Sequence, residues 1–357
     1  MSFSLLCDHL DSPIIHHILS YQNDYLHCLI AKNLRDYKLR KHSKLPISLL
    51  FSTNLFREYQ GVLFNNRFSR VLCLKAVTYG NLVALQWARD GGALLDSRTC
   101  RVAIANGYLE ILEWAISQGC TLELNTCLIA AMNDQLNILQ WARRQGFSWD
   151  ESICSAAAAK GHFEVLQWAK TNGCPWDYRT CMEAAGSGHL EILQWARSNG
   201  CPWDGSVCSY AASHGHLEVL KWARHHGCPW SRYTCQFAAG AGHLHILQWA
   251  REHGCPWDES ACSDAASQGH FEILKWARSY DCPWDESTCM HAARCGYFEI
   301  LQWARRGGCP GTRGRAANLL QQVISRFCSG RVVKVARGMK VRACWPLRRG
   351  SWKYCNG

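Results

Sequence analysis

Residues 188–204 read GHLEILQWARSNGCPWD, and close copies of this stretch recur through the middle of the chain. A cysteine returns every 27 residues, at Cys73, Cys100, Cys127, Cys154, Cys181, Cys208, Cys235, Cys262 and Cys289. A tryptophan keeps the same step, at Trp87, Trp114, Trp141, Trp168, Trp195, Trp222, Trp249, Trp276 and Trp303. A period held over nine registers predicts a repeat architecture, in which stacked units share one continuous core.

Each unit reads as two short helices, as the copy that begins at Asp177 illustrates. Asp177 and Thr180 are candidate N-caps of the first helix, because their side-chain oxygens can accept bonds from free amides. Gly188 suits the left-handed residue that closes a helix. Gly200 and Pro202 end the second helix, whose wide apolar face holds leucine, isoleucine, tryptophan and alanine. Neither helix is long enough to be stable alone, so neighbouring units must complete the core.

The 357-residue chain is 48% hydrophobic and contains 22 cysteines. Such a cysteine content is typical of secreted disulfide frameworks. The first residues, however, have no basic lead and their apolar run ends at Asp8, and no N-glycosylation sequon occurs. No apolar run approaches the roughly 20 residues that a membrane span requires. We therefore expect an intracellular, cytoplasmic protein with reduced thiols and no membrane span.

The net charge of +11 is unevenly distributed. Residues 311–357 contain eleven basic and no acidic side chains, and residues 1–70 contain nine basic and five acidic ones. The repeats at 71–310 therefore carry a net charge of −4, because 39 − 11 − 9 leaves 19 basic and 28 − 0 − 5 leaves 23 acidic residues. The basic character of the protein thus lies in its ends.

The repeat resembles the ankyrin repeat family over about residues 71–310, through the Ala-Ala-x-x-Gly-His-Leu-Glu-Ile-Leu core at Ala184 to Leu193. It is similar in particular to the tryptophan-rich ankyrin arrays of giant DNA viruses and some protists. The resemblance implies an all-α, ankyrin-like solenoid of about nine units. Two features depart from the family: the period is 27 rather than about 33, and Arg179-Thr180-Cys181-Met182 replaces Thr-Pro-Leu-His. We expect a short turn in place of the family's β-hairpin finger.

The cysteine column could indicate metal or disulfide sites. No Cys-x-x-Cys or His-x-x-x-His pair occurs in the repeats. Equivalent positions in stacked units should lie about 8–10 Å apart, beyond the roughly 7 Å that a disulfide allows between Cα atoms. Cys201 and Cys208 belong to one turn region and could approach each other. The interpretation we favour is a small buried hydrophobe that lets helices pack closely.

Histidine and tryptophan recur at further fixed positions. Asn, Gln and Tyr replace histidine in the column His162, His189, His216, His243 and His270, which favours packing or hydrogen bonding over metal ligation. The mid-helix tryptophans are expected to form a core stripe. The Trp of each Cys-Pro-Trp loop either caps the apolar edge between units, which we favour, or anchors a partner.

Positions that change between units are candidates for partner binding, because the scaffold does not constrain them. In ankyrin-like stacks the first helix and the turns line the concave face, so the resemblance implies that these positions contact a partner. The alternative is that they are merely solvated. The aromatic and arginine content favours an interface. The candidate residues are Tyr178, Arg179, Met182, Glu183, Tyr210, Arg232, Tyr233, Gln236, Phe237 and Asp264.

The sequence contains no phosphate-binding loop, no His-Glu-x-x-His and no Gly-x-Ser-x-Gly motif. Side chains repeated nine times are also poor candidates for a unique catalytic site. We therefore expect no enzymatic activity, no catalytic residues, no metal and no cofactor.

The ends do not follow the repeat. In residues 1–70, Pro13 at a helix start followed by Ile-x-x-Ile-Leu spacing is similar to an F-box, which would bind a Skp1-type adaptor; a helical cap over the first repeat explains the segment equally well. Residues 311–357 form a basic tail, expected to be poorly ordered. It could bind nucleic acid or an anionic surface, direct the protein to the nucleus, or have no selected function.

The function that we predict is a non-catalytic scaffold, monomeric, that binds a protein partner of unknown identity on the concave face. The first alternative is a substrate-recognition adaptor of a cullin-type ubiquitin ligase, with residues 1–40 docking the ligase. The second is nucleic-acid or anionic-surface binding through residues 311–357.

Overall fold

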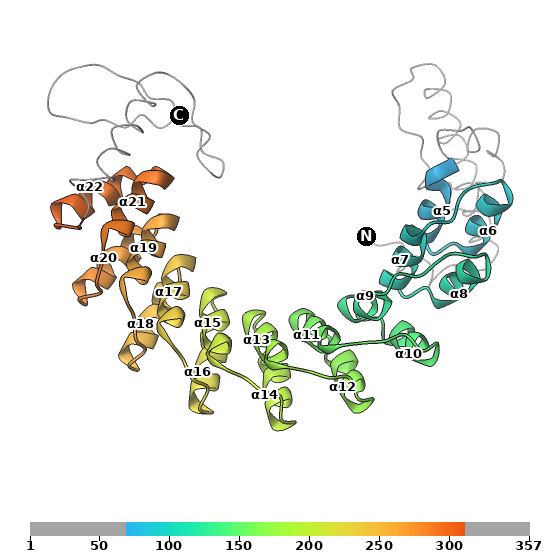
Figure 1. The fold of residues 1–357 in the computed structure, drawn as a ribbon, viewed down its shortest axis with the longest axis horizontal. Helices are drawn as coiled ribbons and strands as arrows, with labels where there is room; N and C mark the ends of the chain where they lie inside the picture. Colours follow the sequence, from blue (N-terminus) through green and yellow to red (C-terminus); the bar gives the residue numbers. More distant parts are fainter. Residues whose placement is uncertain (1–68, 311–357) are drawn as a thin grey trace, which may run out of the picture. The chain divides into compact units, whose positions relative to one another are not determined.

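A computed structural model describes residues 69–310. Within this range it contains 18 α-helices and no strand (Figure 1). The chain divides into two compact units, Met1–Ser148 and Trp149–Gly357. The predicted F-box-like cap, apart from Ser69 and Arg70 at the start of α5, and the predicted basic tail lie outside the described residues. The described chain is a helical repeat solenoid, as the sequence predicts.

The described part of the first unit holds three helix pairs. In each pair a short connection joins a first helix to a second helix. The helices are α5 (Ser69–Thr78), α6 (Leu82–Asp90), α7 (Ser97–Ala105), α8 (Leu109–Ser117), α9 (Thr126–Met132) and α10 (Leu136–Arg144).

The second unit holds six helix pairs. The odd-numbered first helices form one layer and the even-numbered second helices form the other (Figure 1). The helices are α11 (Glu151–Lys160), α12 (Phe163–Thr171), α13 (Tyr178–Gly186), α14 (Leu190–Ser198), α15 (Gly205–Ser213), α16 (Leu217–His225), α17 (Arg232–Ala241), α18 (Leu244–Glu252), α19 (Glu259–Gln268), α20 (Phe271–Ser279), α21 (Glu286–Cys295) and α22 (Phe298–Arg306).

The first helices of the second unit pack closely along the row because their buried face is built from small residues. In α13, Cys181, Ala184 and Ala185 are completely buried, and α13 packs against both α11 and α15. Such side chains let helix backbones approach, so each unit finds in its neighbours the core that it lacks by itself. The second helices contribute larger apolar residues, such as Ile192 and Leu193 in α14.

Most of the mid-helix tryptophans depart from the predicted core stripe, although Trp141 of α10 is buried as predicted. Trp195 is half-buried, whereas Ile192, Leu193 and Ala196 of the same helix are buried. The Trp195 ring makes edge contacts with Trp176, in the loop that precedes its repeat, and with Phe163 of α12.

The helix ends follow the sequence signals closely. The Asp177 side chain accepts a hydrogen bond of 2.9 Å from the Arg179 amide, so Asp177 is the N-cap of α13. The prediction for Thr180 is wrong, because Thr180 lies inside α13 and is completely buried. Gly188 and Gly200 both adopt φ of +79°, which closes the two helices of this repeat. Residues 199–204 contain no strand, so a short turn replaces the finger.

The loop tryptophan joins each repeat to the next one. Arg197 lies over the ring of Trp203, 4.2 Å from its centroid, and also donates a hydrogen bond to the Cys201 carbonyl. The other side of Trp203 makes an edge-to-face contact with Trp222 of the next repeat, with ring centroids 5.9 Å apart. Trp203 is half-buried by these contacts. The loop tryptophan is therefore a cap between units, as we favoured.

This contact recurs along the second unit and distinguishes it from the first. The loop tryptophans contact mid-helix tryptophans in five further pairs, Trp149–Trp168, Trp176–Trp195, Trp230–Trp249, Trp257–Trp276 and Trp284–Trp303. Leu95 and Leu122 occupy the loop register inside the first unit. The second unit thus begins at Trp149, the first tryptophan in this register.

The histidine column packs over glycine, which confirms the packing interpretation. His216 precedes α16 but its side chain does not cap that helix. Its ring lies over Gly188 of the preceding repeat, where an added Cβ would come within 2.6 Å of the imidazole Cε1. His216 also hydrogen-bonds the backbone of Gly186. In the first unit Gln135 lies over Gly107 in the same way.

Gly188 and Gly200 provide a matched test of this contact, since they share a φ of +79° within one repeat. Gly200→Ala meets nothing within 4 Å and should cost about 1 kcal/mol for the left-handed backbone. Gly188→Ala also collides with His216, and should cost about 2–4 kcal/mol in total. Urea unfolding followed by circular dichroism measures both. Equal losses for the two variants would contradict the packing of His216 on Gly188.

Partial burial lowers the pKa of His216 and His243, and the neighbouring His189, His214 and His245 act in the same direction. The fold therefore prefers neutral imidazole at both positions. Stability is full above the unfolded-state pKa of about 6.5, and it falls as the pH drops through that value towards the lower folded-state pKa.

The double variant His216→Gln, His243→Gln should lose less stability between pH 7.5 and 5.5 than the parent protein. Glutamine fits this register, as Gln135 demonstrates, and it does not titrate. Urea midpoints at both pH values check the prediction, with the exposed residue change His225→Gln as the control. An unchanged pH dependence in the double variant would disprove the role of these two imidazoles.

Candidate partner-binding site

All ten candidate residues lie on first helices of the second unit. Their distribution is Tyr178, Arg179, Met182 and Glu183 on α13, Tyr210 on α15, Arg232, Tyr233, Gln236 and Phe237 on α17, and Asp264 on α19. The structure brings three of them, Tyr210, Tyr233 and Phe237, together around one hollow of about 500 Å³.

This hollow, which we call the α15–α17 pocket, lies between two successive first helices and the loop that joins their repeats. Its lining consists of Asp204, Gly205, Ser206, Ser209, Tyr210, Pro229, Trp230, Ser231, Tyr233 and Phe237. The aromatic rings form the walls, and serine hydroxyls and one carboxylate supply the polar atoms. A pocket of this kind holds a side chain rather than an extended cofactor.

The α15–α17 pocket is lined at one side by Gly205, the first residue of α15. The first residue of the first helix is Glu, Tyr, Arg, Glu and Glu in the other five repeats of the second unit. Gly205 has no side chain to fill the same space. A Cβ added to Gly205 would meet no atom closer than the Pro229 carbonyl oxygen, at 3.6 Å. The glycine is therefore not required by the backbone, and it leaves the space open.

The repeat that follows departs from the framework as well. Ser231 replaces the aspartate that caps the other first helices of the second unit, and its side chain makes no capping hydrogen bond. The rings of Tyr233 and Phe237 are 6.1 Å apart. Tyr233 is 47% exposed. Two successive repeats thus differ from the others at the positions that line the pocket.

Tyr210 forms the opposite wall. Its ring lies over Gly186 of the preceding repeat, where an added Cβ would be 3.1 Å from the ring, and it is 6.1 Å from the ring of His214. Ser209 beside it is only 3% exposed and donates a hydrogen bond of 3.0 Å to the Gly205 carbonyl. These contacts hold this wall of the pocket in place.

The remaining candidates lie outside the pocket. Gln236 donates a hydrogen bond of 2.8 Å to the Asp264 carboxylate of the next repeat, so these two side chains bind each other. Arg179 makes an ion pair of 3.6 Å with Asp177, the cap of its own helix. On α13, Met182 and Glu183 are half-buried and do not line the pocket.

Sequence comparison between repeats identifies Gly205 as a turn position that varies, but the candidate residues leave out part of the lining of the hollow. Gly205, Ser231 and Trp230 were not among the candidates, although all three line the pocket. The signal that would have found Gly205 is the missing side chain at a position where every other repeat of the second unit carries a large one.

In the second unit the cysteines form one pair within each of the six repeats. The thiols of Cys181 and Cys201 hydrogen-bond each other, as do those of Cys208 and Cys228. The sequence left open an approach of Cys201 to Cys208; in the structure Cys201 instead hydrogen-bonds Cys181, because the loop folds back onto the first helix of its own repeat. In the first unit the same register holds Cys100 and Cys120, which the structure joins as a disulfide.

These thiols lie in the interior. The hydrogen bond to the neighbouring thiol, together with burial, raises the pKa of Cys181 and Cys208 well above the usual value. Cys201 donates a weak hydrogen bond to the Asp177 carbonyl, 3.4 Å away, and so ties the loop to the helix cap. The cysteines thus act as small buried side chains, as we favoured. Within residues 69–310 no group of three or more potential metal ligands occurs.

None of the helices in the described part of the chain combines the length and the apolar character needed to cross a membrane.

Comparisons with known proteins show a likeness to solved structures only. No protein-family model matches the chain, and a search of curated proteins finds no match. Among solved structures, the crystal structure of the human ASB11 ankyrin repeat domain is similar at 16% sequence identity and a TM-score of 0.36. The similarity covers 44% of this chain and 84% of that chain. Because the sequence identity and the TM-score are both low, the fold is described from the helix pairs of the structure itself.

Proposed function

We propose that the protein is a non-catalytic scaffold that binds a protein partner through the first helices and turns of its second unit. The observation that carries this proposal is the α15–α17 pocket, an open hollow with aromatic walls at the point where two repeats depart from the framework. Tyrosine, tryptophan and arginine are the residues most enriched where protein interfaces concentrate their binding energy.

The constancy of the scaffold supports the same proposal. In the second unit the Cys, Ala, Trp and capping Asp positions are occupied by contacts that hold the repeats together. Because these residues hold the repeats together, we expect recognition to depend on the few positions that vary. The exposed Tyr178 and Tyr233, 40% and 47% accessible, are such positions.

A photo-crosslinking residue in place of Tyr233 tests the proposal in the full chain. We expect it to capture a discrete protein from cells that express the scaffold, because Tyr233 lies at the mouth of the pocket. The same residue in place of Gln194, an exposed position on the second helix α14, is the control and should capture nothing specific. Equal capture from both positions, or from neither, would contradict a binding face on the first helices.

A further inference from the structure

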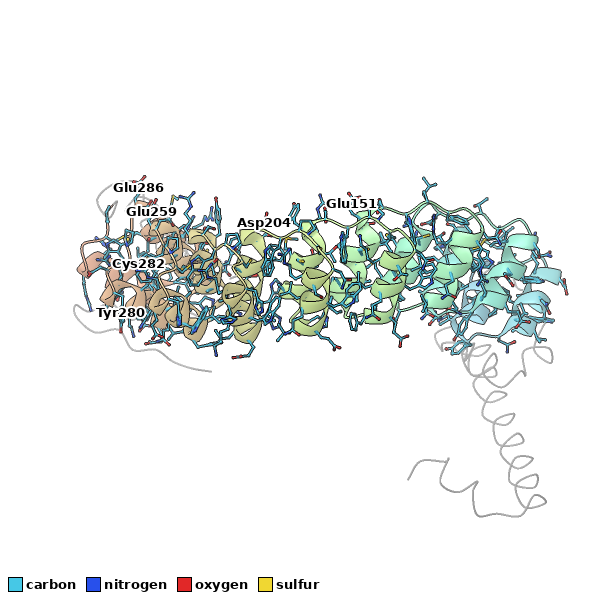
Figure 2. The ribbon with its side chains drawn as sticks, turned by 90° about the horizontal axis from the view of Figure 1, so that it is seen from below. Glu151, Asp204, Glu259, Tyr280, Cys282 and Glu286 are labelled. Carbon is cyan, nitrogen blue, oxygen red and sulfur yellow. A yellow bond between two sulfur atoms is a disulfide. The ribbon has the colours of Figure 1, made fainter. Side chains whose placement is uncertain are left out.

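The α15–α17 pocket combines aromatic walls with an acidic rim. The inference drawn from this combination rests on the proposed function and concerns the chemistry of the occupant. Figure 2 shows Glu151, Asp204, Glu259 and Glu286 along one edge of the second unit. The start of each first helix lies on this edge, and the pocket opens beside Asp204.

Carboxylates outnumber cations at the helix starts on this edge, whereas Lys170, Arg197, Arg224, Arg251 and Arg278 lie over the tryptophans of the adjoining loops. The capping residues and the first two residues of the six first helices include eight carboxylates and two guanidinium groups. The carboxylates are Asp150, Glu151, Asp177, Asp204, Asp258, Glu259, Asp285 and Glu286, and the guanidinium groups are Arg179 and Arg232. A partner that approaches this edge is attracted if it is basic and repelled if it is acidic, as a nucleic acid would be.

Both arginines are already engaged with carboxylates other than that of Asp204. Arg179 pairs with Asp177 at 3.6 Å, and Arg232 pairs with Asp258 at 3.1 Å. Asp204 accepts hydrogen bonds from the amide and the hydroxyl of Ser206. Within residues 69–310 no cation lies at ion-pair distance from Asp204. The carboxylate beside the pocket is thus available to a cation brought by a partner.

The walls suit a guanidinium group in particular. Arg232 already lies over the ring of Tyr233, 5.3 Å from its centroid. The same type of contact holds Arg224 over Trp230, a lining residue of the pocket, 4.0 Å from the ring centroid. A planar guanidinium stacks on aromatic rings and donates hydrogen bonds in the plane, whereas an aliphatic side chain would use the walls and leave the carboxylate unpaired.

We propose that the α15–α17 pocket receives an arginine side chain from a basic segment of the partner protein. The guanidinium lies among Tyr210, Tyr233 and Phe237 and pairs with Asp204. The surrounding carboxylates of the edge attract the rest of the basic segment. Gly205 acts as a specificity determinant, because any side chain at that position occupies the space that the arginine takes.

Fluorescence polarisation with the full-length protein tests the occupant. The probe is a labelled glycine–serine peptide that contains arginines, and the comparison peptides carry citrulline, leucine or glutamate in their place. Citrulline keeps the shape of arginine without its charge. We expect the arginine peptide to bind at least about tenfold more tightly than the citrulline and leucine peptides, and the glutamate peptide not to bind.

Two variants locate that binding in the pocket. Gly205→Tyr fills the space with the residue that Tyr178 places at the start of α13, and should abolish binding of the arginine peptide without loss of fold, since a Cβ fits there. Asp204→Asn keeps a capping oxygen but removes the charge, and should weaken binding about tenfold. Glu259→Tyr, the same kind of change two repeats further on, is the control and should leave most of the binding intact.

Three results would overturn the proposal. Equal binding of the leucine and arginine peptides would show that the pocket selects only for apolar groups. Binding of the arginine peptide that survives Gly205→Tyr would place the peptide elsewhere. Absence of binding would exclude arginine as the occupant. A crosslink from position 233 to residues 311–357 of the same molecule would identify the chain's own basic segment, not a partner, as the occupant.

The peptide and crosslinking experiments separate the two proposals. If the crosslink captures a partner and Gly205→Tyr abolishes it, while no arginine peptide binds, the binding face stands and the arginine assignment fails. If the arginine peptide binds in the pocket but position 233 captures no protein, the chemistry of the pocket stands and the scaffold function fails.

Discussion

The contact on which the second unit depends is the loop tryptophan held between two repeats. Trp203 has the Arg197 guanidinium on one side and the Trp222 ring of the next repeat at its edge. Contacts of these two kinds each contribute about 0.5–1.5 kcal/mol. Arg197 of α14 also donates a hydrogen bond to the Cys201 carbonyl, which fixes the turn to α14. The contact of Trp203 with Trp222 fixes the same turn to α16, the second helix of the next repeat. Short helix pairs that cannot fold alone are thereby joined into a row.

This framework determines where recognition can occur. The turns and the first helices are positioned by buried alanines, thiol pairs and capping aspartates, and these residues recur from repeat to repeat. Under the proposed function, recognition depends on a local departure from this framework. Gly205 lacks the side chain that the other repeats of the second unit carry at this position. The rings of Tyr210 and Phe237 line the pocket together with Gly205. A rigid scaffold makes such a hollow possible because the surrounding helices do not collapse into it.

The sequence predicted the features that depend on period and local chemistry. The 27-residue step gave the helix pairs, Asp177 was identified as a cap, and Gly188 and Gly200 as the left-handed residues. Predictions failed where the path of the chain between elements decides the outcome. The pairing of Cys181 with Cys201 needs a loop that folds back over the first helix, and nothing in the spacing specifies that direction.

The candidate site was predicted in part for the same reason. Tyr210, Tyr233 and Phe237 were found because they vary between repeats while their neighbours stay constant. Their arrangement around one hollow depends on the offset between successive repeats, which places Pro229 and Trp230 beside Gly205. That offset is set by packing of the loop on the next helix pair, and a single sequence does not reveal it.

Hydrogen exchange of the full chain carrying Trp203→Ala measures the central contact most directly. Loss of the ring removes both the Arg197 stack and the edge contact with Trp222. The account predicts faster exchange in α14 and α16, on the two sides of that junction, and little change in α20 and α22. Protection that is unchanged at the junction, or lost equally along the whole second unit, would contradict the claim that each loop tryptophan joins one repeat to the next.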